Sequence, residues 1–205
     1  GFLRKFMMEN AGAAAAKRIE EKYAPVWFLD TDYKKILVFA GLGNNGGDGL
    51  VIARHLAGYG ANVTVFLLGK PDNIRSEECS WNWSLLEKMK SVKLLTGGNL
   101  EDLNNLKFKI IIDGILGTGI SGEIREPHAS AIEFINGKVW GGVVSVDVPS
   151  GLNPDTGEAN KRCVNANMTV TFHRMKVGMQ KRTDVCGEIF VEKIGIPLEA
   201  EIGVL

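Results

Sequence analysis

The chain has 205 residues, a length that suits one α/β domain with a sizeable core. Its 24 basic Lys and Arg residues balance its 24 acidic Asp and Glu residues, so the charge gives no electrostatic footprint for nucleic acid or an anionic membrane. No apolar run approaches the ~20 residues that a membrane span needs. The cysteines, Cys79, Cys163 and Cys186, are odd in number and form no C-x-x-C pair. They predict unpaired thiols in a reducing compartment, the cytoplasm.

The predicted elements alternate between helices and strands. The first is a helix over Phe2–Tyr23 with an apolar face, and residues 1–24 are expected to pack on the core that follows. Strands are expected at Lys35–Ala40, Asn62–Leu68, Val92–Leu95, Lys109–Asp113, Gly142–Asp147, Met168–Phe172 and Glu188–Lys193. Further helices are expected at Asp48–Gly58, Ser76–Met89, Leu100–Asn105 and His128–Asn136.

Near-continuous apolar strands that alternate with helices indicate a mostly parallel sheet with helices on both faces. Right-handed crossovers make this a doubly wound, Rossmann-like α/β fold with three α/β/α layers. We expect one domain over residues 1–205. The last two strands have no convincing helix between them, so an edge hairpin is the alternative for that pair.

A glycine-rich loop, Gly41–Gly49, follows the first strand and reads GLGNNGGDG. Missing Cβ atoms let a backbone approach a ligand, and free N–H groups at a helix start attract phosphate. No acidic residue stands at the tip of the second strand, which disfavours an ordinary NAD-dependent dehydrogenase. Asp48 is interpreted first as the N-cap of the following helix, with ligand contact as the alternative.

Polar loops also follow two later strands, and the carboxyl ends of parallel strands meet at one edge of a sheet. Asn45, Asp113 and Ser150 offer one oxygen donor from each of the three loops, which suits a low-charge cation better than a transition metal. The alternative is that Asp113 and Ser150 only cap their loops. Asp147 ends a buried strand, where a carboxylate can act as general acid or base, unless it only forms a turn.

Four ordered motifs carry a family resemblance, at Met8–Gly12, Gly43–Leu50, Asp113–Gly119 and Val146–Leu152. They resemble those of the NAD(P)H-hydrate epimerase family, which includes the apolipoprotein A-I-binding proteins and the N-terminal domains of bifunctional nicotinamide-nucleotide repair enzymes. The resemblance extends over nearly the whole chain. It implies interconversion of the R and S forms of hydrated NADH and NADPH, called NADHX and NADPHX. These carry a hydroxyl at C6 of the nicotinamide ring, and a dehydratase specific for the S form then repairs them.

The resemblance also implies roles for individual residues. Asp147 would contact the hydrated nicotinamide or its ribose, and we hypothesise that it handles the proton of the exchange. A potassium ion would be bound by Asn45, Asp113 and Ser150. The substrate would be held by Asn44, Asn45, Gly46, Gly47 and Asp48 from the first loop and by Gly117, Thr118, Gly119, Ile120, Ser121, Gly122 and Glu123 from the second.

Some members of the family carry a lysine where this chain has Ser121, and Lys176 and Arg125 are candidates to replace it. The resemblance implies a homodimer, and a dehydratase that is fused to the chain or works with it. A different class of function stays open, namely a non-catalytic scaffold of the same fold that binds nucleotides or proteins. The intact Asp147 and the intact set of cation ligands favour the enzyme.

Overall fold

A computed structural model describes residues 2–97, 99–119 and 122–201 of the chain, so the predicted site residues Ile120 and Ser121 lie outside the described residues. Seven strands form one sheet in the order β3-β2-β1-β4-β5-β6-β7, and all neighbours are parallel. The strands are β1 (Lys35–Ala40), β2 (Asn62–Leu68), β3 (Val92–Gly97), β4 (Ile110–Gly114), β5 (Gly142–Val146), β6 (Met168–Phe172) and β7 (Glu188–Glu192).

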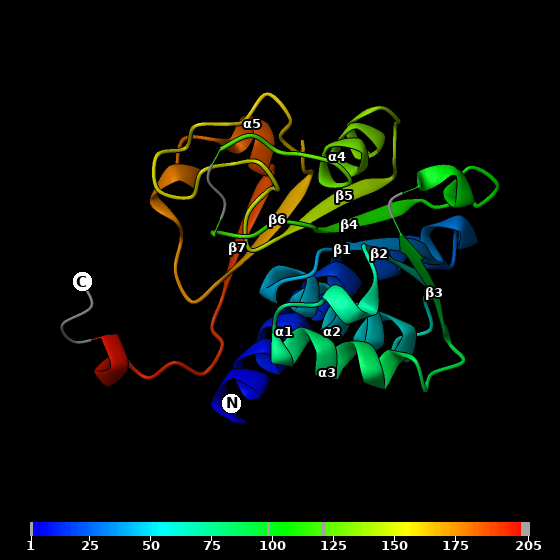
Figure 1. The fold of residues 1–205 in the computed structure, drawn as a ribbon, viewed down its shortest axis with the longest axis horizontal. Helices are drawn as coiled ribbons and strands as arrows, with labels where there is room; N and C mark the ends of the chain where they lie inside the picture. The colour runs from blue at the N-terminus through cyan, green and yellow to red at the C-terminus, as the bar shows by residue number, and fades with distance from the viewer. Residues whose placement is uncertain (1, 98, 120–121, 202–205) are drawn as a thin grey trace.

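Helices cover both faces of this sheet, which confirms the predicted three-layer α/β/α fold. In Figure 1, α1 (Phe2–Trp27), α2 (Asn44–Gly58) and α3 (Glu77–Leu86) lie below the sheet, and α4 (His128–Asn136) lies above it. The short helix α5 is Thr183–Cys186. Five 3-10 helices complete the described elements: η1 (Thr31–Lys34), η2 (Pro71–Asn73), η3 (Leu100–Leu103), η4 (Val177–Met179) and η5 (Leu198–Glu201).

The alternative of an edge hairpin is wrong, because β6 and β7 pair in parallel. A parallel pair needs a crossover of a dozen or more residues, and residues 173–187, which contain η4 and α5, supply it. The helix predicted over Leu100–Asn105 is only the short η3. The first helix runs past its predicted end, with Pro25 inside it, because Tyr23 and Trp27 bury their rings in the core.

The central strand β1 shows how the core is divided between the two faces. Ile36 and Val38 belong to the apolar cluster beneath α1 and α2, whereas Leu37 and Phe39 belong to the cluster beneath α4. All four are fully buried, as expected of a strand that is covered on both sides. The buried strand therefore holds the start of the glycine-rich loop firmly in place.

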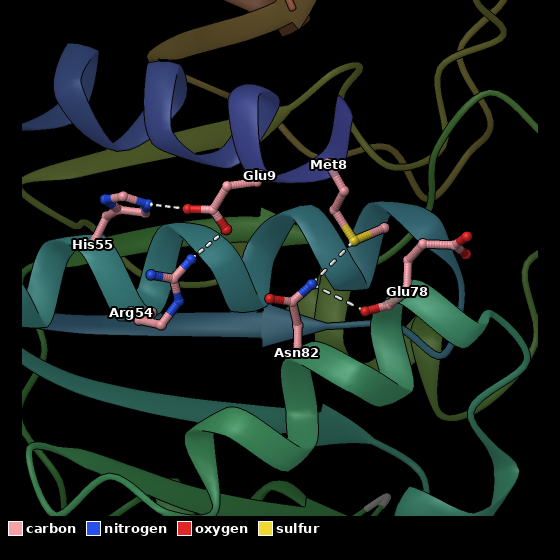
Figure 2. Close-up of polar contacts among 6 residues, drawn as sticks. All are labelled: Met8, Glu9, Arg54, His55, Glu78 and Asn82. Atoms are coloured by element: carbon pink, nitrogen blue, oxygen red, sulfur yellow. Dashed lines mark hydrogen bonds and ion pairs between the residues drawn. The ribbon is translucent and has the colours of Figure 1, made fainter. Parts of the chain in front are cut away.

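The first helix is fixed to α2 and α3 by side chains that point inward from it (Figure 2). The Glu9 carboxylate forms an ion pair with Arg54 and lies 2.8 Å from Nε2 of His55, both on α2. On α3, the Asn82 amide donates to the sulfur of Met8 at 3.4 Å. Glu9 thus anchors α1 near the carboxyl end of α2, while Met8 also packs against Gly47 in the first turn of α2, where the glycine-rich loop ends.

Candidate active site

The loops after β1, β4 and β5 meet at the carboxyl edge of the sheet. The chain order reverses between β1, which leads to β2 on one side, and β4 on the other. Such a switch point is where open α/β sheets bind their ligands. A cavity of about 400 Å³ opens there. Its walls come from all three loops, with Arg75 and His128 added: Leu42, Gly43, Asn44, Asn45, Asp48, Arg75, Ile115, Leu116, Gly117, Thr118, Gly119, His128 and Asp147.

A second cavity of about 490 Å³ adjoins the first. The two share four residues, Asn44, Asp48, Thr118 and Asp147. The other walls come from α1, α3, the end of β6 and the segments after it: Arg4, Met7, Met8, Ala11, Glu78, Phe172, His173, Lys176 and Ile194. The Met8–Gly12 motif therefore contributes to the site as a wall, which its position in the sequence did not reveal.

The glycine-rich loop is closely packed. A Cβ atom on Gly41 would lie 2.0 Å from the carbonyl oxygen of Ile115, and one on Gly46 would lie 1.9 Å from that of Gly41. Gly47 touches Met8, because a Cβ there would lie 2.6 Å from Cε of that side chain. Glycine at these positions lets the first loop, the second loop and α1 converge.

The helix α2 begins at Asn44 and has Gly43 as its N-cap. The interpretation of Asp48 as the N-cap is therefore wrong. Gly43 has no side chain to satisfy the first N–H groups, and the first intrahelical bond comes from the N–H of Gly47. The N–H groups of Asn44 and Asn45 at the cavity wall are therefore suited to bind an anionic group such as phosphate.

Asn45, Asp113 and Ser150 come together as the sequence predicts. Asp113 is fully buried and accepts from Ser145 Oγ at 2.8 Å, from the Ser150 N–H at 2.9 Å and from Ser150 Oγ at 2.5 Å. The Asn45 amide donates to the carbonyl oxygen of Leu116 at 3.0 Å, and Ser150 Oγ lies 3.2 Å from the same oxygen. Burial raises the pKa of Asp113, although its bonds to Ser150 and Ser145 oppose the rise.

This group of oxygen atoms fits a monovalent cation. The side-chain oxygen of Asn45 is buried and has no hydrogen-bond partner in the structure, and an isolated buried oxygen is costly. The amide of Asn45 is linked by hydrogen bonds to the carbonyl of Leu116, and through it to the hydroxyl of Ser150 and the carboxylate of Asp113. A single carboxylate with neutral oxygens gives the low charge and hard donors that potassium accepts.

Asp147 has a different environment. Its φ of 65° is left-handed, a region that Asp and Asn tolerate better than most residues. Its Oδ1 accepts from Thr171 Oγ1 at 3.1 Å and from the Phe172 N–H at 3.2 Å, and it forms an ion pair with Lys176. The strained backbone turns the carboxylate toward both cavities, where only 18% of the side chain is exposed.

Other titratable groups at the site are perturbed as well. Burial, and then the nearby charge of Asp147, raise the pKa of Asp48 well above its ordinary value, while Lys176 opposes the rise. Burial and the charge of Arg75 lower the pKa of His128. Arg75 is tied to the first loop, because its N–H donates to the carbonyl oxygen of Leu42 at 2.8 Å. No local pattern marked Arg75 and His128 as site residues, since only the tertiary fold brings them to the cavity.

The residues predicted to form the second substrate loop lie in different places in the structure. Gly117, Thr118 and Gly119 line the first cavity. Gly122 instead lines a separate cavity of about 320 Å³, and Glu123 is exposed outside both active-site cavities. Of the two candidates to replace the family lysine, Lys176 reaches the site and pairs with Asp147, whereas Arg125 is exposed.

Comparison with known proteins identifies the family. A sequence profile described as YjeF-related protein N-terminus matches residues 4–178. The chain belongs to this family. The match covers the three loops and the segment that carries Lys176, so every residue that lines the first cavity belongs to the family's domain.

Two archaeal relatives in the family are similar over the whole chain. Proteins named NAD(P)H-hydrate epimerase from Nitrosopumilus maritimus and Cenarchaeum symbiosum are 63% and 59% identical, over 100% of this chain and 92% of each relative. A protein of Methanothermobacter thermautotrophicus named bifunctional NAD(P)H-hydrate repair enzyme Nnr is 44% identical. The match covers 98% of this chain but only 38% of that longer protein.

A solved structure shares the fold. The crystal structure of yeast ynu0 aligns with a TM-score of 0.80 at 29% identity and covers 98% of this chain and 83% of the yeast chain. The described part of this chain also contains no helix long and apolar enough to cross a membrane.

Proposed function

We propose that the chain is an isomerase that interconverts the R and S forms of NADHX and NADPHX at C6 of the nicotinamide ring, in nicotinamide-nucleotide repair. The observation that carries this proposal is the 63% identity, over the whole chain, to a protein named NAD(P)H-hydrate epimerase. The site supports it, since an anion-binding helix start and an ion-paired carboxylate line one cavity.

The chemistry at C6 needs proton transfer. An acid gives a proton to the C6 hydroxyl, the C6–O bond breaks with its electron pair going to oxygen, and water leaves. The ring nitrogen supplies the electron pair that forms the iminium. Water then adds to either face and returns a proton to a base. Asp147 lines both cavities, and in this proposal it exchanges a proton with the water that leaves or enters.

We further propose that potassium binds beside the substrate through Asn45, Asp113 and Ser150. The unpartnered buried oxygen of Asn45 supports this assignment. When bound, the ion supplies fixed positive charge next to the second loop. The residues of this chain position that loop through Leu116, whose N–H donates to Ser150 Oγ at 2.9 Å and whose carbonyl accepts from Asn45.

The homodimer and the cytoplasmic location remain predictions. Leu3 on α1 and Trp81 on α3 are large apolar side chains with 70% and 41% exposure, so both helices are candidate dimer surfaces. The other tryptophan of α3, Trp83, is buried in the core. A dehydratase that consumes the S form is the expected partner, as a separate protein or a fused domain, because the longer repair enzymes contain a region similar to this chain.

The test is equilibration of purified (R)-NADHX with the protein, followed by chromatography that resolves the two epimers. The proposal predicts appearance of the S form faster than the spontaneous rate measured without protein. The same assay with NADPHX tests the second substrate. No acceleration, with tight nucleotide binding retained, would instead favour the non-catalytic scaffold.

A further inference from the structure

We propose that Asp48 is a second catalytic acid, which in its neutral form donates the proton that removes the C6 hydroxyl on one face of the ring. Asp147, ionised and paired with Lys176, accepts the proton of the water that adds on the other face. The assignment rests on the proposed epimerase function. With two carboxyl groups, each transfers a proton on one face of the ring, whereas a single group would have to transfer protons on both faces.

The first support is the position of Asp48. It lies on α2, one turn after the anion-binding helix start, and lines both cavities together with Asp147. The helix α1 closes over it, because a Cβ atom on Gly12 would lie 2.4 Å from Val51 Cβ and 3.1 Å from the carbonyl oxygen of Asp48. Met8 closes the neighbouring turn by its contact with Gly47. The packing of α1 fixes the backbone of this turn of α2, from which Asp48 lines both cavities.

The second support is the unequal number of hydrogen-bond donors to Asp147 and to Asp48. Asp147 receives three donors on one oxygen, including the ammonium group of Lys176. Within the described part of the chain, no hydrogen bond or ion pair reaches the carboxyl of Asp48. Two carboxylates that share a small cavity with one lysine resist double ionisation, and the group with fewer donors keeps the proton. The raised pKa of Asp48 agrees with this division.

Other charged groups near Asp48 do not change the conclusion that Asp48 keeps the proton. The positive end of a helix favours an ionised carboxylate, but the effect falls off within the first turn, and Asp48 is the fifth residue of α2. Lys176 forms an ion pair with Asp147 instead. Among the described residues, the titratable groups that line these two cavities with Asp48 or act on it are Arg4 from α1, Glu78 and Cys79 from α3, Arg75 before α3, His128 at the start of α4, Asp147 after β5, and His173 and Lys176 after β6.

No proton is gained or lost over one epimerisation. Asp48 loses a proton to the leaving hydroxyl, water departs, and the ring becomes an iminium. Water adds from the other face and gives its proton to Asp147. A proton then passes between the two carboxyl groups through cavity water, which restores neutral Asp48 and ionised Asp147. The reverse reaction uses the same groups in exchanged roles, as an interconversion of two epimers requires.

The test compares Asp48→Asn with wild type in the epimer assay over a range of pH, with the spontaneous rate subtracted. Loss of the acid predicts a fall in kcat of about 10²- to 10⁴-fold with KM changed less than about threefold. The wild-type kcat should fall at high pH as Asp48 ionises, and this alkaline limb should be absent from Asp48→Asn. Exposed Asp102 on η3 gives the matched control, since Asp102→Asn should keep the wild-type profile.

A second readout does not depend on turnover. Infrared difference spectra between wild type and Asp48→Asn at neutral pH should show the C=O band of a neutral carboxylic acid in wild type only. Retention of kcat within threefold and of the alkaline limb in Asp48→Asn would overturn the assignment, as would the absence of that band. A wild-type protein that fails to accelerate epimerisation would refute the proposed function instead, and the infrared result would still report the proton on Asp48.

Discussion

Asp113 and Asp147 stand at the carboxyl ends of adjacent strands, yet their surroundings are opposite. Asp113 is the penultimate residue of β4 and is fully buried, with both oxygens engaged by neutral donors from Ser145 and Ser150. Asp147 follows β5 in a left-handed conformation, and all its described donors, including Lys176, bind one oxygen. Since no donor in the described part of the chain binds its other oxygen, that oxygen is available to the cavity.

This comparison shows how one residue type serves two purposes at one sheet edge. A carboxylate with both oxygens occupied holds loops in place, and Asp113 is in addition a ligand of the cation that we propose. A carboxylate bonded on one oxygen is oriented by its donors, while its second oxygen stays available to substrate or water. The difference comes from the donors and from φ, and the identity of the residue does not reveal it.

The largest expected effect tests the catalytic role that we propose for Asp147. Asp147→Asn should lower kcat by about 10²- to 10⁴-fold, because an amide cannot take the proton. The fold should persist, since Asn tolerates the left-handed φ of 65°. Epimer chromatography measures kcat, and a thermal melt measures Tm. Near-normal turnover in this variant would end the assignment of Asp147, and Asp102→Asn again serves as the exposed control.

The next effect tests the cation site around Asp113. Potassium that binds only the folded protein should raise the free energy of unfolding by about 2.7 kcal/mol at a hundredfold excess over its Kd. Choline chloride at equal ionic strength is the control for general salt effects. Equal Tm values in the two salts, over a wide concentration range, would contradict a potassium site at Asn45, Asp113 and Ser150.

The replacement of Asp113 by Asn should lower the stability of the protein more than it lowers kcat. Asp113→Asn places an amide donor among the donors of Ser145 and Ser150, which should cost about 1–3 kcal/mol. Each kcal/mol corresponds to a fall in Tm of about 2–4 °C for a domain of this size. Denaturant unfolding measures the loss directly. An Asp113→Asn protein as stable as wild type would contradict the structural role that the comparison with Asp147 assigns to Asp113.

Two hydroxyl groups provide a matched pair with smaller effects. Ser150→Ala removes a donor to Asp113 and an acceptor for the Leu116 N–H, so we expect a loss of about 1–2 kcal/mol in unfolding free energy and a weaker response to potassium. Thr171→Val removes only a donor to Asp147 and should cost about 1 kcal/mol or less, with its main effect on kcat. The reverse pattern would mean that the two aspartates have exchanged roles.

The smallest effect is the pH dependence of stability at Asp113. Its pKa is raised in the folded protein, so the folded state binds its proton more tightly than the unfolded chain does. The contribution to stability is fully present below the unfolded pKa of about 3.9 and is lost as pH rises through the folded pKa. The stability of wild type relative to Asp113→Asn should therefore decrease as pH rises. Denaturant titrations of both proteins at several pH values measure this difference, and an increase would contradict it.

The sequence alone determined the class of fold and which loops form the candidate site. Near-continuous apolar strands such as Lys35–Ala40 can be buried only in a sheet covered on both faces, so the parallel α/β architecture followed from them. The motifs at Gly41–Gly49, Asp113 and Asp147 come at strand ends, and parallel topology brings such ends to one edge. These properties are encoded locally, by periodicity and by position along the chain.

Only the tertiary structure decided which partners each side chain has. The pairing of β6 with β7 depends on a crossover without a long helix, which left no periodic signal. The role of Asp48 depends on α1 closing over α2, and that of Asp147 on Lys176, which lies 29 residues further along the chain. Protonation and reactivity arise from burial and from donors that are distant in sequence. The sequence therefore indicates which residues form the site, but it does not indicate which of them carry a charge.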